Sequence, residues 1–390
     1  MRKKLPKFES AYHRLVVSQL IGEATLIYPL YSIMFSDRSS ISASGVGLLL
    51  AVWQITQIIS EVPTGIIADK FSKKYSIVAG RLLKALCFVF WFSTPNFAGY
   101  MIGFIIWGIG EAFISGATQA YLYELNEGKK DSNYLKSYSQ LKSLEMMTYT
   151  VTYFITFLIG PKYQLLIVLS ILSMLFSSVI ALTLPVGKVF SGQTIRGILG
   201  SAFANISVSK SLKRKFAEAL IVGGTLGMLV EMIVVNYRDY GASPKIVPLL
   251  ISFSTLVTAT SFWLLHYYKK FFEKHVIILL LIFTGTFIIM FNMSMWWQIF
   301  GLFFVGRFIR VLAVKQEADM LEDIEERSRA TVLSSYSLMV KLFSATQIFL
   351  VGLLAVNNSI NLPTFWLVNI SMVSFAILYL VNNRTNRVAK

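Results

Sequence analysis

The sequence predicts an all-α integral membrane protein with about twelve transmembrane helices in two six-helix halves. Three observations lead to this fold class: the composition, the length of the apolar segments and the placement of the basic residues. Of the 390 residues, 55% are hydrophobic and only 14% are charged, whereas a soluble domain carries about 25% charged residues. We therefore expect most of the side-chain surface to face lipid or other helices.

Apolar segments of about 20 residues recur along the whole chain, and this is the length that a helix needs to cross a hydrocarbon core about 30 Å thick. Because backbone groups in lipid must pair internally, such segments form either a helical bundle or a closed barrel. The segments are continuous and do not alternate with a period of two, which favours the bundle. We expect spans to begin near Arg14, Ala43, Ser76, Gly99, Ser139, Tyr163, Lys213, Pro244, Val276, Met295, Ala330 and Leu362.

One long connection, residues 186–212, is rich in glycine and basic residues and reads as a cytoplasmic linker. It separates an N-terminal six-helix half, residues 1–185, from a C-terminal six-helix half, residues 213–390. A weak internal repeat agrees with this division, because the pattern Leu-x-Ser-Tyr-Ser at residues 135–139 recurs at residues 333–337. Parallel repeats of six helices produce such a pattern.

The formal net charge of +16 follows the expected topology. Basic residues crowd into alternate loops and into both ends of the chain, which is the positive-inside rule, and this places both termini in the cytoplasm. We expect anionic lipid head groups as the partner of this charge, and no nucleic acid. The first span lacks a cleavage site and is expected to stay as an uncleaved anchor. The basic loops hold Lys3, Lys4, Lys7, Lys70, Lys73, Lys74, Lys129, Lys130, Lys136, Lys210, Lys213, Arg214, Lys215, Lys269, Lys270 and Lys274.

A charged motif joins the second and third expected spans. Its sequence is Glu61-Val62-Pro63-Thr64-Gly65-Ile66-Ile67-Ala68-Asp69-Lys70-Phe71-Ser72-Lys73-Lys74. The motif resembles the signature loop between helices two and three of the major facilitator superfamily, with Ser72 where that family prefers glycine. The resemblance implies the fold of that family and a secondary active transporter that works by alternating access, in the plasma membrane and as a monomer.

A second resemblance lies in the fourth expected span, at Gly108-Ile109-Gly110-Glu111-Ala112-Phe113-Ile114-Ser115-Gly116-Ala117. This stretch is similar to the fourth helix of bacterial members of the family, many of which are described as drug exporters. The resemblance implies export of a small amphiphilic compound or drug. Two features depart from the exporter pattern: Phe104 stands near the place of a frequent arginine, and Met146-Met147-Thr148-Tyr149 replaces a Gly-Pro signature.

Six ionisable residues are the mid-span candidates, at a depth where a charge costs about 2.5–3.5 kcal/mol and indicates function. They are candidates for binding the substrate and coupling it to protons, and each has an alternative role as a pair that only holds helices together. The resemblance implies that helices one, four, seven and ten line a cavity, so we expect the acids and bases to pair across it. The six residues are Glu23, Glu111, Glu231, Arg307, Arg310 and Lys341.

Helical periodicity places Glu111 on one polar face with Ser115, Thr118 and Gln119. Burial raises the pKa of a carboxylate and a nearby base lowers it, so an acid between the two influences can gain and release a proton. Our hypothesis is that cargo displaces Arg310 or Lys341 from Glu111 and thereby couples transport to the proton gradient.

A further group of residues is expected at the cytoplasmic ends of helices two to four. The resemblance implies that it forms a latch at the inner gate, although the lysines have a simpler topological reading. By contrast, Lys142 and Glu145 read as an ordinary ion pair three residues apart on one helix. The expected gating residues are Glu61, Gly65, Asp69, Lys70, Lys73, Lys74, Arg81 and Glu124, with Lys84 beside them.

Other classes of function fit less well. The chain has no His-Glu-x-x-His or Gly-x-Ser-x-Gly motif for an enzyme and no Gly-x-x-x-x-Gly-Lys loop for an ATP-driven pump. With Cys87 as its single cysteine, it predicts no disulfide, zinc cluster or other cofactor. Uptake of a small solute by symport or uniport, and a non-transporting sensor on the same fold, stay open as alternatives.

Overall fold

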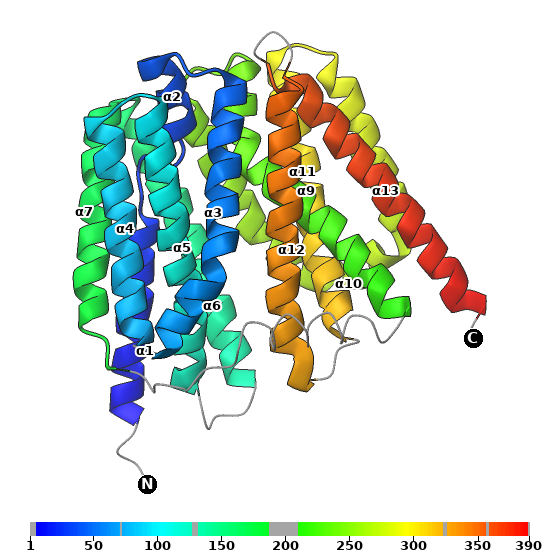
Figure 1. Ribbon diagram of the computed structural model, residues 1–390. Coiled ribbons are helices and arrows are strands. Elements are labelled where there is room, and N and C mark those ends of the chain that lie inside the picture. The colour runs from blue at the N-terminus through cyan, green and yellow to red at the C-terminus, as the bar shows by residue number, and fades with distance from the viewer. Residues whose placement is uncertain are drawn as a thin grey trace. The chain divides into compact units, whose positions relative to one another are not determined.

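The computed structural model describes residues 5–70, 72–126, 132–186, 210–322, 326–355 and 359–388. This part of the chain is almost entirely α-helical, and nine of its helices are long and apolar enough to cross a membrane (Figure 1). The predicted fold class, an all-α membrane protein, is confirmed. The helices are α1 (Leu5–Glu23), α2 (Tyr31–Ser39), α3 (Ala43–Lys70), α4 (Lys73–Ser93), α5 (Phe97–Asn126), α6 (Ser132–Ile159), α7 (Tyr163–Leu182), α9 (Lys210–Asp239), α10 (Val247–Phe291), α11 (Met295–Glu322), α12 (Glu326–Leu353) and α13 (Asn361–Val388).

Two expected spans, those beginning near Pro244 and Val276, form one continuous helix, α10. The sequence contains no glycine or proline between Pro248 and Gly285, so nothing in the chain interrupts the helical hydrogen bonds there. The lysines expected in a loop at this place therefore lie on a helical backbone. Only the outer parts of α10, Val247–Thr258 and Lys274–Phe291, are apolar segments of the described residues.

Backbone contacts divide the chain into two compact units. The first contains residues 1–41, 52–192 and 243–259, and the second contains residues 42–51, 193–242 and 260–390. Helices α3 and α10 therefore contribute to both. Most of the expected linker lies outside the described residues, and a division into two six-helix halves stays a prediction.

In the first unit, α4 is the central helix and packs against α5 and α7, while α1 packs against α6 and α7. Glycines permit the close approach of α4 and α5: a Cβ atom on Gly80 would lie 2.5 Å from the carbonyl oxygen of Gly110. Aromatic rings pack together elsewhere along these two helices, with Trp91, Phe104 and Trp107 in mutual contact. In the second unit, α9 is central and packs against α11, α12 and α13.

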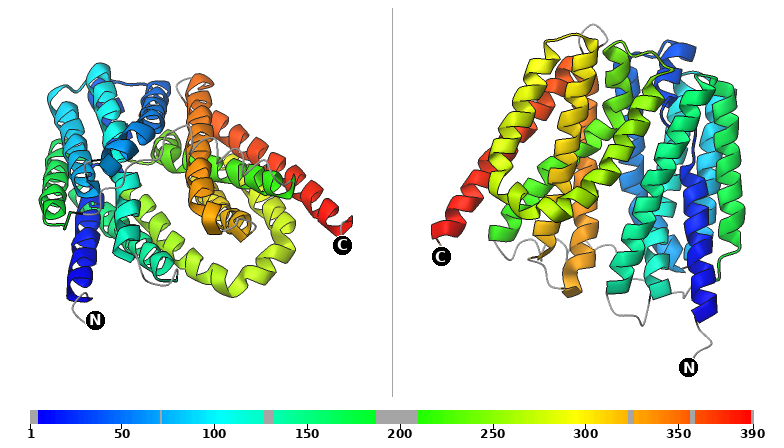
Figure 2. Two further views of the ribbon diagram at one scale, coloured as in Figure 1. Left: turned by 60° about the horizontal axis from the view of Figure 1, so that its bottom comes forward. Right: turned by 180° about the vertical axis from the view of Figure 1, so that it is seen from behind.

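The first expected span is broken into two helices (Figure 2, right). Helix α1 ends at Glu23, an irregular segment follows, and α2 begins at Tyr31. Pro29 lies in the irregular segment, where its ring removes a backbone donor and disfavours helical geometry at the residue before it. An interruption of this kind is tolerated at membrane depth only where neighbouring groups satisfy the freed backbone atoms.

Side chains of α6 and α7 supply these partners. The Ser170 hydroxyl accepts a hydrogen bond from the Ile27 amide at 3.1 Å, and the Thr156 hydroxyl donates to the Leu26 carbonyl at 2.9 Å. The Ser173 hydroxyl donates to the carbonyl of Ile21 at the end of α1. The break in the first span is thus held by hydroxyl groups, and it fixes Glu23 at the end of a helix.

Candidate functional site

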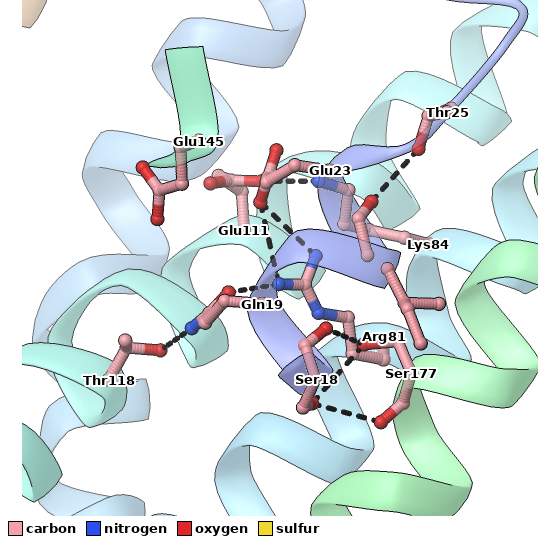
Figure 3. A network of polar contacts seen from close by, with 12 residues as sticks. Ser18, Gln19, Glu23, Thr25, Arg81, Lys84, Glu111, Thr118, Glu145 and Ser177 are labelled. Atoms are coloured by element: carbon pink, nitrogen blue, oxygen red, sulfur yellow. Dashed lines mark hydrogen bonds and ion pairs between the residues drawn. The ribbon is translucent and has the colours of Figure 1, made fainter. Parts of the chain in front are cut away.

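Two buried ion pairs lie at the centre of the first unit. The Arg81 guanidinium on α4 contacts Glu23 on α1, with 3.3 Å between Arg81 Nη1 and Glu23 Oε1 (Figure 3). The same guanidinium donates to the side-chain oxygen of Gln19, one turn earlier on α1. It lies directly against Gly22, where a Cβ atom would stand 2.2 Å from Arg81 Cζ. A glycine at this position is what lets the arginine reach the end of α1.

The second pair joins α4 to α5. Lys84 Nζ donates to Glu111 Oε2 at 2.8 Å, and the ammonium lies 5.5 Å from the ring centroids of both Tyr28 and Trp107. Aromatic faces attract a cation at this distance, more strongly where water is excluded. The lysine is therefore held by one carboxylate and two rings, so its charge is compensated although its side chain is buried.

Hydrogen bonds extend the network to α6. The Tyr149 hydroxyl donates to Glu23 Oε2 at 2.7 Å, so this carboxylate contacts both an arginine and a phenol. Also on α6, Lys142 Nζ donates to Glu145 Oε2 at 2.7 Å. Gln19 in turn donates to the hydroxyl of Thr118 on α5. Helices α1, α4, α5 and α6 thus meet in one region of polar contacts.

These side chains border a pocket of about 120 Å³ inside the first unit. Three carboxylates from three different helices, Glu23, Glu111 and Glu145, face it together (Figure 3). The polar face predicted for the fourth span lies along it, and polar side chains outnumber apolar ones in its lining. The lining consists of Gln19, Glu23, Glu111, Ile114, Ser115, Thr118, Gln119, Leu122, Leu141, Lys142, Glu145 and Tyr149.

Within the described residues, no group of three or more His, Cys, Asp and Glu side chains has the arrangement of a metal site. The carboxylates of the pocket are instead each within contact distance of a base. Chemically, the arrangement can bind a polar solute and exchange protons among carboxylates, since three acids and their basic partners lie around one pocket.

Arg81 and Lys84 lie deeper than the sequence suggested. We expected them beside Glu61 and Glu124 at the cytoplasmic helix ends, and the structure places them with Glu23 and Glu111 instead. Counted from the start of α4 at 1.5 Å per residue, they lie about 12 and 17 Å along the helix, which is the middle of a membrane span.

Glu111 contacts Lys84 within the first unit. Its expected pairing with Arg310 or Lys341, which belong to the second unit, stays a prediction. The expected pair of Lys142 and Glu145 is present, but the sequence did not predict that Glu145 is buried beside the pocket. A signal was present, because Glu145 and Tyr149 lie on one helical face four residues apart.

At the charged motif, residues 61–74, only two residues separate α3 from α4. Helix α3 continues to Lys70 and α4 begins at Lys73, so the motif is largely helical where a loop was expected. Lys73 forms a buried ion pair with Glu124 at the end of α5, which brings two of the expected gating residues together.

The other expected gating residues lie on α3 and at the start of α4. Lys74 lies 5.4 Å from the ring centroid of Tyr75. A Cβ atom added to Gly65 would have open space around it, with no neighbour within 4 Å, and Glu61 is half-buried on α3. The side chains of Asp69 and Lys70 lie outside the described residues.

Four of the predicted charged residues belong to the second unit: Glu231 on α9, Arg307 and Arg310 on α11, and Lys341 on α12. The Arg307 guanidinium lies 5.7 Å from the centroid of the Phe303 ring on its own helix. All four side chains are half-buried. Their pairing with the acids of the first unit stays a prediction.

Comparison with known proteins agrees with the architecture. Residues 17–135 match the family model described as Major Facilitator Superfamily. This chain is 29% identical over 105 residues to the uncharacterized MFS-type transporter YxaM of Bacillus subtilis (strain 168), which is 27% of this chain and 26% of YxaM. It is 29% identical over 115 residues to an uncharacterized transporter of Buchnera aphidicola subsp. Schizaphis graminum, covering 30% and 26% of the two chains. The matches thus span about a quarter of each curated relative.

The whole fold is similar to solved transporter structures. The nucleoside transporter NupG (D323A mutant) aligns over 95% of this chain and 100% of its own, with a TM-score of 0.75 and 14% sequence identity. The D-xylose-proton symporter aligns over 94% and 97%, with a TM-score of 0.71 and 14% identity. The chain therefore has the fold of the major facilitator superfamily, and its N-terminal third carries the sequence pattern of that family.

Proposed function

We propose that this chain is a secondary active transporter that works by alternating access and couples the movement of a small solute to protons. The observation that carries the proposal is the polar pocket of the first unit, where Glu23, Glu111 and Glu145 meet inside a helical bundle. Ionisable groups at membrane depth are costly, and they mark paths for substrates and ions. The similarity to a nucleoside transporter and to a D-xylose-proton symporter supports transport as the activity.

Glu111 is the residue proposed to link the solute to the proton. It is the most open of the three carboxylates at 26% exposed, whereas its partner Lys84 is fully enclosed. A solute that separates Lys84 from Glu111 leaves the carboxylate without its counter-ion in surroundings of low polarity. Such a carboxylate binds a proton, and return of the lysine releases it. Solute binding and proton binding at Glu111 are thereby coupled.

The proposed direction is export of a small amphiphilic compound, because the fourth helix resembles that of drug exporters. Uptake of a hydrophilic solute by proton symport is the second candidate. It is favoured by the lining of the pocket, where polar side chains outnumber apolar ones. We further propose that the protein is a monomer in the plasma membrane. Both of its termini are proposed to lie in the cytoplasm, because basic residues crowd into alternate loops.

The contact between Lys73 and Glu124 is proposed to be part of the inner gate. It joins the start of α4 to the end of α5 at the end of the bundle where the basic loops predict the cytoplasm. Opening of this pair is expected to admit solute from that side, together with movement of Glu61, Asp69 and Lys70 at the end of α3.

The test is proton movement in energised inside-out vesicles that contain a pH-quenched dye. A panel of lipophilic cations, antibiotics, nucleosides and pentoses is added one at a time. We expect at least one compound to restore fluorescence with the wild type and to lose this effect in Glu111→Gln. The control is Asp37→Asn, which removes an exposed acid that accepts a hydrogen bond from Tyr163 and does not line the pocket.

The same panel separates the two directions. A compound that moves protons out of the vesicle lumen is exchanged for them, which supports export from the cell. A compound that enters right-side-out vesicles only with an inward proton gradient supports uptake. Compounds that bind the purified protein without any flux would contradict transport and favour the sensor.

A further inference from the structure

The three carboxylates of the pocket have basic partners that differ in burial. The Arg81 side chain beside Glu23 is 0% exposed, and that of Lys84 beside Glu111 is 2% exposed. Lys142, the partner of Glu145, is 49% exposed, although Glu145 itself is only 8% exposed. The counter-ion of Glu145 is therefore the one that reaches the outside of the unit, while the carboxylate that it neutralises is inside.

The two buried bases are fixed by further contacts. Arg81 also bonds Gln19 and lies against Gly22, and Lys84 lies over the rings of Tyr28 and Trp107. Moving either base breaks several interactions at once. Lys142 is half-exposed, so rotation of its long side chain can carry the ammonium from Glu145 into water. Lys142 is thus the base of this network that already reaches water, whereas Arg81 and Lys84 are enclosed.

Separation of Lys142 leaves a buried carboxylate without a counter-ion, and such a group is stable only in its neutral, protonated form. The charges around the pocket balance in the structure: Glu23 from α1, Glu111 from α5 and Glu145 from α6 face Arg81 and Lys84 from α4 and Lys142 from α6. A proton that binds Glu145 as Lys142 leaves keeps this balance.

We propose that Glu145 is the carboxylate through which the transported proton enters the pocket, with Lys142 as a counter-ion that moves away to admit it. The inference rests on the proposed function and adds a residue for which the sequence predicted only an ion pair within one helix. One proton is added to a Glu145 carboxylate oxygen, and no covalent bond other than that O–H bond is formed. Lys142 keeps its own proton and its charge.

A route from Glu145 into the network is present. Tyr149 follows Glu145 by one helical turn on α6, and its hydroxyl donates to Glu23 Oε2 at 2.7 Å. The pocket of about 120 Å³ borders Glu145, Tyr149, Glu23 and Glu111, and one water needs only about 10–15 Å³ of such space. Waters in the pocket would connect the proton on Glu145 with Tyr149 and with Glu111, where the solute is proposed to act.

The experiment is an infrared pH titration of the purified, full-length protein in lipid nanodiscs, without any solute. The signal is the C=O stretch of a protonated carboxyl group shielded from water. We expect the wild type to show this band, Glu145→Gln to lose it, and Glu111→Gln to keep it. In Lys142→Gln, the midpoint at which the band disappears with rising pH should lie about one pH unit higher, because the charged neighbour that opposes protonation is gone. Lys162→Gln, outside the network, is the matched control and should titrate like the wild type.

A band that survives in Glu145→Gln, or a titration that Lys142→Gln leaves unchanged, would overturn the proposal. The Lys142 variant removes a half-exposed side chain, so the test does not depend on Glu145→Gln being well folded. The vesicle assay is independent of this outcome: a wild type that titrates as expected but moves no solute contradicts the proposed function, and a transporter whose band ignores both residues contradicts this inference alone.

Discussion

At the scale of single residues, the proposed coupling depends on buried charges, each of which contacts a charge of opposite sign. Removing one partner of a buried ion pair leaves an isolated charge and costs about 3–5 kcal/mol, whereas replacing both partners by neutral groups costs much less. An exposed pair contributes about 0–1 kcal/mol. The pair of Lys84 with Glu111 is of the first kind, because the lysine is 2% and the glutamate 26% exposed.

This difference gives the first prediction. Lys84→Met is expected to lower the free energy of unfolding by about 3–5 kcal/mol, because it removes the buried base that contacts Glu111. Lys162→Met removes the same charge from an exposed position outside the network and should change the free energy of unfolding by less than about 0.5 kcal/mol. The measurement is unfolding of the purified protein in mixed detergent micelles, followed by circular dichroism. Adding Glu111→Gln to Lys84→Met should recover most of the loss, and equal losses in the two single variants would contradict the assignment.

The second prediction concerns Gly22. Gly22→Ala is expected to push the Arg81 guanidinium away from Glu23, because the added Cβ would lie 2.2 Å from Arg81 Cζ. Overpacking of this kind costs about 1–3 kcal/mol, and we expect proton-coupled flux to fall by about tenfold where about 1.4 kcal/mol of this cost enters the transport barrier. Gly116→Ala is the control, because no atom lies within 4 Å of its Cβ position. Full flux in Gly22→Ala would show that the contact between Arg81 and Glu23 is not needed for proton-coupled transport.

At the scale of the element, the break between α1 and α2 is the feature that positions the site. It ends α1 at Glu23 and leaves backbone groups that Thr156, Ser170 and Ser173 satisfy from neighbouring helices. A continuous helix would have paired those groups internally and offered no helix end at this depth. The interruption therefore ties the position of the carboxylate to the packing of α1 against α6 and α7.

The third prediction tests whether Ser170 stabilises the break between α1 and α2. Ser170→Ala removes the acceptor of the Ile27 amide and should cost about 1–3 kcal/mol, the usual penalty for a buried donor left without a partner. Thr148→Ala is a matched control, because its exposed hydroxyl bonds the Leu144 carbonyl within α6, and it should change stability by less than about 0.5 kcal/mol. Hydrogen exchange across residues 24–30 is the sharper measurement. Faster exchange there in both variants alike would remove Ser170 from this role.

Much of each element could be read from the sequence, and the exceptions have physical causes. The helix starts at Ala43, Met295 and Tyr163 agree with the expected ones, because long apolar runs with charged ends define a membrane helix without tertiary information. The depth of Arg81 could not be read in this way, because charged residues at the start of α4 hide where its span begins. Pairing was equally out of reach: the polar face around Glu111 shows periodicity, but periodicity does not identify the base that faces it.

At the scale of the whole molecule, the fold and the network of charges depend on different features of the sequence. The fold matches solved transporters along almost the full chain at 14% identity, so it is set by the pattern of apolar helices and not by particular side chains. The network of Glu23, Arg81, Lys84, Glu111 and Glu145 depends on the particular residues of this chain. The central claim is therefore that these buried charges couple a solute to protons on a transporter scaffold.

The measurement that tests this claim most directly compares two kinds of flux in proteoliposomes, with a solute identified in the vesicle panel. One is movement of the labelled solute driven by a pH gradient, and the other is exchange of labelled for unlabelled solute without any gradient. We predict that the wild type performs both, whereas Glu111→Gln retains exchange and loses the pH-driven movement. Full pH-driven movement in Glu111→Gln would contradict proton coupling through this network.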